Sequence, residues 1–155
     1  MAAKKTWREK INETEEKFHV ITPEYEERYG KGKILISKPL DIERLINQTK
    51  KGELLTNDII RGVLTKEKKV QATDPITVGI FLRIIAEAAE EEKETEEKVT
   101  PYWRVLKPDG TINIKLPGGV KRQIEYLETE GHSIIMGKGK KPPKVDEFES
   151  KLKSY

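Results

Sequence analysis

The chain has 155 residues, of which 35% are hydrophobic and 37% charged, and its net charge is +3. It has no cysteine and only two widely spaced histidines, His19 and His132, so we expect no disulfide, no thiol nucleophile, no metal and no cofactor. No apolar run approaches the roughly 18 residues that a membrane span needs, and the first residues lack the apolar stretch of a secretory signal, so we expect a cytoplasmic protein without a membrane segment.

Residues 1–38 are predicted to form an N-terminal extension. Within it, residues 6–18 have weak helical periodicity, and residues 22–30 predict a short helix that Gly30 closes. Lys33 to Ser37, with the sequence KILIS, predicts an edge strand. No residue in this segment suggests chemistry.

Two amphipathic helices are predicted after the extension. The first begins at Pro39, a residue suited to the first turn of a helix, and the second follows a turn around Gly52 with Thr56 or Asn57 as its cap. Their apolar residues recur at helical spacing and define the expected core: Leu40, Ile42, Leu45, Ile46, Ile59, Ile60, Val63 and Leu64. A lysine-rich link is predicted over residues 65–73.

A third helix is predicted to begin at Asp74 and Pro75, and its densely apolar first half must be buried. Its second half, from Glu87 to Glu97, holds seven glutamates and one lysine. The local charge there is −6 against +3 for the whole chain, so the remaining residues carry +9. We expect this half to project or fray. The charge separation fits either a basic face opposite an acidic projection or a solvated helix face.

The rest of the chain predicts short strands and two further helices. In chain order these are a strand over 103–107, a turn at 108–110, a strand over 111–116, a helix from the Gly118-Gly119 pair to Gly131, a strand over 132–136, a basic turn over 137–144 and a terminal helix over 145–155. Three helices followed by a strand, a helix and a basic tip predict a mainly α fold with short β strands, a winged helix-turn-helix domain over residues 39–155.

The segment from Val99 to His132 carries a specific motif. Pro101, Arg104 and Val105 are followed by the glycine pair Gly118-Gly119, and Leu127, Glu130, Gly131 and His132 come after it at fixed spacing. This pattern resembles the active-site segment of the O6-alkylguanine-DNA alkyltransferases, in which Pro-Cys-His-Arg-Val precedes a Gly-Gly pair, a helix and a Glu-Gly. A weaker resemblance extends upstream. There Val78-Gly79 resembles the Val-Gly of the family's recognition helix, so the resemblance covers residues 40–135. It implies the winged-helix fold of that family's C-terminal domain.

The departures from the family pattern exclude its reaction. Tyr102 stands at the position of the family's cysteine nucleophile, and a phenol with a pKa of about 10 cannot replace a thiolate near neutral pH. Trp103 replaces the histidine that relays the proton, and its indole nitrogen only donates. A non-catalytic branch of the family also carries an aromatic residue at the cysteine position. Ile76 matches the family's arginine finger, and Asn57 its nucleotide-rotating tyrosine.

These residues predict a non-enzymatic protein that binds double-stranded DNA and senses alkylated or extrahelical bases. An aromatic pair at 102–103 would stack on such a base, and Ile76 would wedge a base step. The candidate DNA-binding residues are Tyr102, Trp103, Arg104, Ile76, Asn57, Gly118, Gly119, Lys121, Lys138, Lys140 and Lys141.

Each feature has a structural alternative. The aromatic pair can fill the vacated pocket as core, Arg104 can hold loops together, the glycine pair can serve a tight turn, and the lysines can be a solvated tip. The alternative function is a protein-interaction domain that kept the fold and lost DNA binding, using the acidic helix 87–97 or the N-terminal extension to bind a basic partner. An open aromatic pocket on a basic face would favour DNA binding; a filled pocket beneath an acidic helix would favour the alternative.

Overall fold

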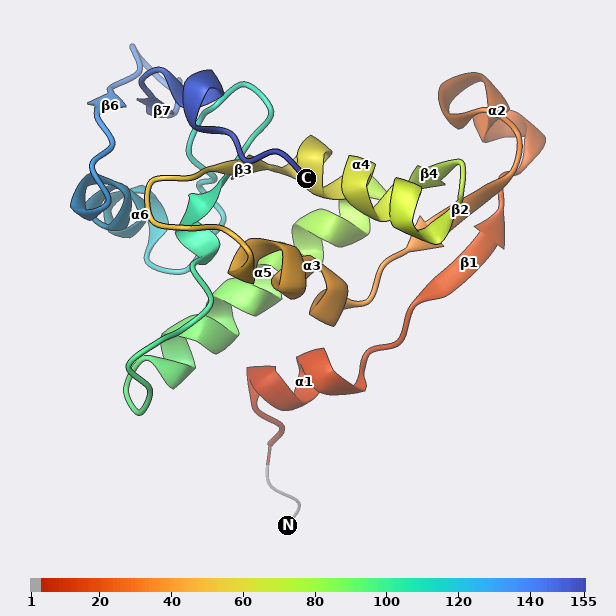
Figure 1. The fold of residues 1–155 in the computed structure, drawn as a ribbon, viewed down its shortest axis with the longest axis horizontal. Helices are drawn as coiled ribbons and strands as arrows, with labels where there is room; N and C mark the ends of the chain where they lie inside the picture. Colours follow the sequence, from red (N-terminus) through yellow and green to blue (C-terminus); the bar gives the residue numbers. More distant parts are fainter. Residues whose placement is uncertain (1–3) are drawn as a thin grey trace.

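The computed structural model describes residues 4–155 (Figure 1). Its α-helices are α1 (Trp7–Glu13), α2 (Pro23–Tyr29), α3 (Pro39–Asn47), α4 (Asn57–Lys68), α5 (Pro75–Glu92) and α6 (Gly119–Thr129), and its 3₁₀ helices are η1 (Tyr102–Arg104) and η2 (Phe148–Lys151). Its strands are β1 (Lys17–Val20), β2 (Lys33–Ile36), β3 (Leu55–Thr56), β4 (Ala72–Thr73), β5 (Val105–Leu106), β6 (Ile134–Ile135) and β7 (Lys144–Val145). The predicted fold class, mainly helical with short strands, is confirmed.

The predicted helices α3, α4 and α5 are present and begin where their sequence signals lie. The side chain of Asp74 caps α5 by accepting a hydrogen bond from the backbone N–H of Thr77, and Pro75 occupies the first turn. Thr56 precedes α4, as predicted, but its side chain makes no capping hydrogen bond. Helix α5 has 18 residues, so it is about 27 Å long.

The largest core cluster joins α3, α4 and α5 to the N-terminal segment. Its buried side chains are Ile11, Leu35, Ile42, Leu45, Ile46, Leu55, Ile60, Leu64, Val78, Leu82, Ile85, Ala88 and Val105. Ile11 comes from α1 and Leu35 from β2, so the segment predicted as an extension contributes to the same core as the helices after Pro39. The division of the chain at residue 38 stays a prediction.

The N-terminal sheet corrects two predictions. Strand β2 was predicted as an edge strand, but it is the central strand, antiparallel to β1 and parallel to β4. Strand β1 was not predicted: its residues, Lys17–Val20, alternate between polar and apolar types, but the run is short and all four residues are exposed. The lysine-rich link of residues 65–73 contains the last turn of α4 and the short strand β4.

The C-terminal third also differs from its predicted elements. Residues 102–104 form a 3₁₀ turn, so the strand predicted over 103–107 shortens to β5. The strand predicted over 111–116 is absent, and only η2 forms where a terminal helix was predicted. Helix α6 is present, and after it the antiparallel hairpin β6–β7 carries the basic turn as predicted. A second core cluster, which includes Leu106, Leu127 and Phe148, lies beneath this hairpin.

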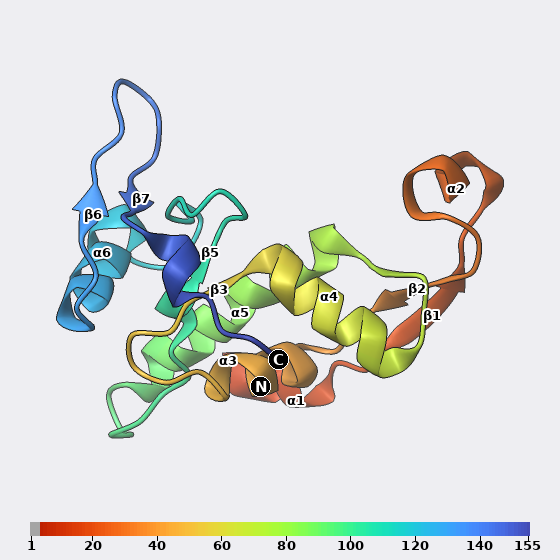
Figure 2. The same cartoon turned by 45° about the horizontal axis from the view of Figure 1, so that its top comes forward.

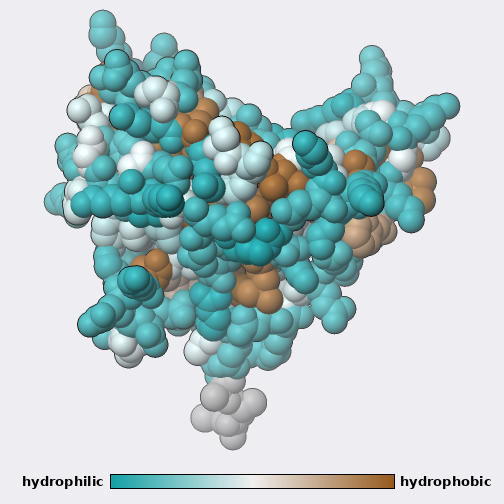
Figure 3. Space-filling model, viewed as in Figure 1, coloured by the Kyte–Doolittle hydropathy of each residue, from teal (hydrophilic) through white to brown (hydrophobic). Residues whose placement is uncertain are grey.

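Figures 1 and 2 place the N-terminal end of α5 between two projections. The hairpin β6–β7 stands on one side of it, and α2 with the β1–β2 hairpin stands on the other. The space-filling view has a notch between these two parts (Figure 3). Over residues 4–155 there is no helix with both the length and the apolar character needed to cross a bilayer.

Candidate nucleic-acid interface

Tyr102, at the predicted nucleophile position, lies inside the protein with only 2% of its surface exposed. Its ring packs against Ala86 and Ala89 of α5 and against Leu116. Its hydroxyl donates a hydrogen bond to Oε1 of Glu90 at 3.0 Å. Burial, followed by the charge of Glu90, raises the pKa of this phenol well above its usual value. Tyr102 therefore fills the pocket beneath the acidic half of α5.

The Glu90 carboxylate accepts hydrogen bonds from three side chains at this pocket, one of which is Tyr102. The hydroxyl of Tyr126 donates to the same Oε1 at 3.0 Å, and the Arg122 guanidinium lies 3.2 Å from it. Tyr126 and Arg122 both belong to α6. The carboxylate therefore ties α5 to η1 and α6 at once, and it closes the pocket from the α5 side.

Trp103 packs edge-on against Tyr102, with ring centroids 5.4 Å apart, and lies 4.6 Å from the ring of Tyr126. Its backbone carbonyl accepts a hydrogen bond from the Gln123 side chain at 3.0 Å. Its indole Nε1 is buried and has no hydrogen-bond partner among residues 4–155. The three rings form one aromatic cluster between η1 and α6, so the pair predicted as a stacking platform is packed against the chain itself.

Arg104 is also buried, with 8% of its surface exposed. Its Nε and Nη2 bind the Glu130 carboxylate at 2.9 Å and 2.7 Å. Its Nη1 donates to the carbonyl and hydroxyl oxygens of Thr49 at 2.9 Å and 3.0 Å. All three guanidinium nitrogens are engaged, so Arg104 joins the end of α6 to the end of α3. In this structure it cannot contact a phosphate.

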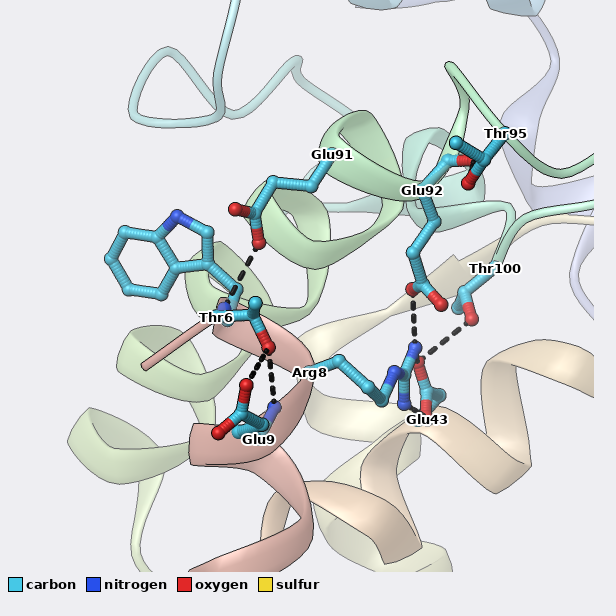
Figure 4. A network of polar contacts seen from close by, with 9 residues as sticks. Thr6, Arg8, Glu9, Glu43, Glu91, Glu92, Thr95 and Thr100 are labelled. Carbon is cyan, nitrogen blue, oxygen red and sulfur yellow. Dashed lines mark hydrogen bonds and ion pairs between the residues drawn. The ribbon is translucent and has the colours of Figure 1, made fainter. Parts of the chain in front are cut away.

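The acidic run from Glu87 to Glu97 was predicted to project or fray. Its helical part, residues 87–92, is instead held by α1 (Figure 4), whereas residues 93–97 lie beyond the end of α5 and are exposed. Arg8 bonds Glu92 at 2.8 Å and forms a two-pronged pair with Glu43 at 2.6 Å and 2.8 Å. The backbone N–H of Trp7 donates to Glu91 at 2.9 Å. Hydrogen bonds that Arg8 donates to the two carboxylates raise the pKa of Arg8 above its usual value, chiefly the bonds to Glu43. The prediction was wrong for the helical part, because Glu91 and Glu92 find partners in the N-terminal segment.

The N-terminal half of α5, in contrast, presents an open face. Ile76 is 72% exposed and Ile80 53% exposed, and Arg83 follows them on the same side of the helix. Residues four and three apart share one helical face, so these side chains form an exposed row along the N-terminal half of α5. Of the predicted residues, Ile76 is therefore placed where it can contact a partner.

The predicted glycine pair and Asn57 have structural roles. Gly118 and Gly119 have φ values of +79° and +67°, and a side chain on Gly118 would collide with Arg122. The pair therefore turns the chain into α6, where other residues would be strained. Asn57 is half-buried at the start of α4, and its Oδ1 accepts a hydrogen bond from Nε of Arg61 at 2.9 Å.

The predicted lysines are exposed. Lys121 lies in the first turn of α6, and Lys138, Lys140 and Lys141 lie on the loop between β6 and β7. Within the described part of the chain none of the four forms an ion pair. The same residues contain no cluster of three or more His, Asp or Glu side chains that could hold a metal ion.

Taken together, the predicted site residues separate into two groups. Tyr102 and Arg104 are buried and Trp103 is half-buried against them, whereas Ile76 and the four lysines face solvent. Sequence reasoning also missed two surface hollows of about 430 Å³ and 510 Å³, which lie beside α4 and beside the start of α5. Both include residues of the N-terminal segment, for which the resemblance offers no counterpart.

No protein-family model and no curated protein sequence matches the chain. Among solved structures, it is similar to Atl1 of S. pombe, whose structure was determined in complex with damaged DNA containing O6-carboxymethylguanine. The TM-score is 0.52 at 18% sequence identity, and the match covers 76% of this chain and 94% of the other. At this identity the similarity shows a shared fold.

Proposed function

We propose that this protein binds duplex DNA without catalysis, using the exposed N-terminal half of α5. The observation that carries the proposal is the open row of Ile76, Ile80 and Arg83, at the end of the helix that the sequence resemblance assigns to DNA recognition. The solved structure with this fold is a complex with damaged DNA, which supports the same use of the fold here. The absent cysteine leaves no nucleophile for alkyl transfer.

The chemistry of this face suits a duplex. Apolar side chains such as isoleucine can wedge between base steps in the minor groove. The lysines of the β6–β7 loop stand on one side of this face and can neutralise phosphates further along the duplex (Figure 2). Affinity from these lysines would be independent of sequence and sensitive to salt.

Sensing of an alkylated base is the finer part of the proposal, and it requires the pocket to open. A base entering beside Tyr102 must displace the ring from between Ala89 and Leu116 and break the bond to Glu90. Flipping a base already costs a few kcal/mol, so opening adds to an existing cost. Duplex binding at Ile76 needs no such opening, and we expect it to be the main activity.

One observation favours a second function. The pocket is filled beneath an acidic helix, which is the arrangement expected of a domain that lost DNA and binds a protein. However, three of the seven glutamates, Glu90, Glu91 and Glu92, already have partners within the chain, so this part of the acidic surface is unavailable to a basic partner. DNA binding remains the first proposal for this reason.

The test is a fluorescence-anisotropy titration with a short duplex, with and without one O6-methylguanine, at two salt concentrations. We expect salt-sensitive binding to both duplexes. Replacing Ile76 with glutamate should weaken binding by about tenfold, because it removes the wedge and adds a charge that repels phosphate. The matched control is Leu40→Glu, which adds the same charge to an exposed apolar position on α3.

The outcomes separate the alternatives. A preference for the lesion that Tyr102→Ala abolishes would establish sensing through the pocket. Equal weakening by Ile76→Glu and Leu40→Glu would show that α5 is not the contact. No binding of either duplex at low salt would refute DNA binding and favour the protein-interaction function.

A further inference from the structure

Two hollows lie side by side near the start of α5, and they share one residue, Tyr29. The first lies against the C-terminal half of α4 and the segment that follows it, up to Thr73. The second lies between the β1–β2 hairpin, α2 and the first turn of α5, where Ile76 lines it. Neither hollow contains Tyr102 or Trp103, so both are separate from the closed pocket.

The two hollows differ in charge. The first has three cationic side chains, Arg61, Lys66 and Lys69, against one carboxylate, Asp58. The second is lined mainly by apolar and aromatic groups, and its carboxylates outnumber its single arginine, Arg28. An anion is therefore favoured in the first hollow and a neutral, largely apolar group in the second.

The second hollow offers aromatic faces. Tyr25 is 52% exposed, and neither its side chain nor that of His19 forms a hydrogen bond or an aromatic pair within residues 4–155. Tyr29 lies at the boundary with the basic hollow. Figure 3 shows apolar side chains exposed at the end of the molecule that β1, β2 and α2 form. Rings of this kind are the usual platform for unstacked bases, whatever their sequence.

The backbone at Lys69 is unusual for a lysine. The residue ends α4 in the left-handed conformation, with φ +54° and ψ +45°, where glycine or asparagine is common. Lysine is less favourable than glycine in this left-handed conformation, but its side chain lines the first, positively charged hollow. The position therefore allows the charge to be removed by a substitution that relieves the backbone.

We propose that the two hollows together bind an unstacked nucleotide of a single-stranded segment. The base lies in the second hollow against Tyr25 and Tyr29, and a neighbouring phosphate lies in the first beside Arg61 and Lys69. A volume of about 510 Å³ is within the range of small-molecule sites and ample for one base. The inference rests on the proposed DNA binding, because Ile76 joins the second hollow to the face of α5 that contacts the duplex.

The experiment compares a fluorescein-labelled 16-base-pair duplex with the same duplex carrying a three-nucleotide single-stranded extension. A free single strand of the extension sequence is the third probe. We expect the extension to tighten binding by roughly tenfold, the effect of stacking one base on an aromatic side chain. Tyr25→Ala should remove this advantage and leave affinity for the plain duplex unchanged, and Tyr25→Phe should keep it because the ring is retained.

Two further variants locate the site. Lys69→Gly should weaken binding of the extended duplex and lower the salt dependence of its affinity. Because glycine adopts the left-handed conformation of Lys69 without strain, we expect the variant to fold. Phe18→Ala is the matched aromatic control, because Phe18 is 44% exposed on β1 but does not line the hollow. Lys51→Gln is the matched charge control at an exposed position away from both hollows.

Each outcome decides between the two proposals. Binding of the plain duplex without an advantage for the extension overturns the nucleotide site and leaves the proposed function standing. Binding of the single strand without the duplex overturns the proposed function and supports the site. If Tyr25→Ala and Lys69→Gly both still bind the extended duplex more tightly than the plain one, the single strand binds elsewhere and the nucleotide site is overturned. If no probe binds, both the proposed function and the nucleotide site are overturned.

Discussion

Replacing Tyr102 with alanine tests whether the former nucleophile position now belongs to the core. The side chain is 2% exposed and packs between α5 and Leu116. Truncating a buried aromatic side chain to alanine typically costs about 3–5 kcal/mol, because burial is lost and a cavity remains. A domain of this size has a total stability of about 5–15 kcal/mol, so the loss is a large fraction of the whole.

The matched variant is Tyr102→Phe, which keeps the ring and removes the hydroxyl. We expect it to cost about 1–2 kcal/mol, because one hydrogen bond to a carboxylate is lost while Glu90 keeps Tyr126 and Arg122. Urea unfolding followed by circular dichroism measures both variants. A loss below about 1 kcal/mol for Tyr102→Ala would refute the reasoning, because it would mean that the ring occupies an open pocket rather than a packed one.

Three further results are expected. Arg8→Ala should destabilise the protein by about 2–3 kcal/mol in urea unfolding, since it leaves the buried Glu43 carboxylate without its cationic partner. A change below about 0.5 kcal/mol would show that the Arg8–Glu43 ion pair does not stabilise the fold. Tyr102→Cys should not transfer a labelled alkyl group from O6-methylguanine DNA, because the thiol would be buried and Trp103 cannot accept its proton; measurable transfer would show that the site opens readily. Burial lowers the pKa of His132, so as the pH falls the unfolded chain takes up a proton at this residue before the folded protein does. The free energy of unfolding should therefore be fully retained above pH 6.5 and decrease below it. In His132→Gln this free energy should decrease less between pH 7 and 5.5, and equal decreases in the two proteins would refute the assignment.

The elements that the sequence predicted correctly have local causes. Asp74 and Pro75 fix the start of α5, Pro39 fixes that of α3, and the positive φ of Gly30 ends α2. These signals involve side chains and backbone atoms within a few residues of each other, so they are visible in the sequence. Local signals also predicted α6 and the strand that follows it, but they misassigned residues 111–116 as a strand.

The errors arise from contacts between distant parts of the chain. Strand β1 exists because it pairs with β2, and its four exposed residues are too short a run to predict a strand by themselves. The acidic half of α5 is ordered because Arg8, 84 residues away, bonds Glu92. The closure over Tyr102 depends on Glu90 meeting two residues of α6. The sequence indicated which residue had replaced the cysteine, but whether that residue left an open pocket depended on packing.

The acidic half of α5 is weaker evidence against DNA binding than its charge suggests. At a rise of about 1.5 Å per residue, Glu87 lies about 16 Å and Glu91 about 22 Å along the helix from Ile76. The Debye length is about 8 Å at physiological ionic strength, so phosphates at Ile76 are two or more screening lengths from these carboxylates. Arg122 and Arg8 further offset the charges of Glu90 and Glu92. The remaining repulsion between these glutamates and the DNA phosphates should matter mainly at low salt. Under the same conditions, the lysines of the β6–β7 loop attract the phosphates. Neutralising those lysines should therefore weaken duplex binding more at low salt than at high salt, whereas Ile76→Ala should weaken it by a similar factor at both.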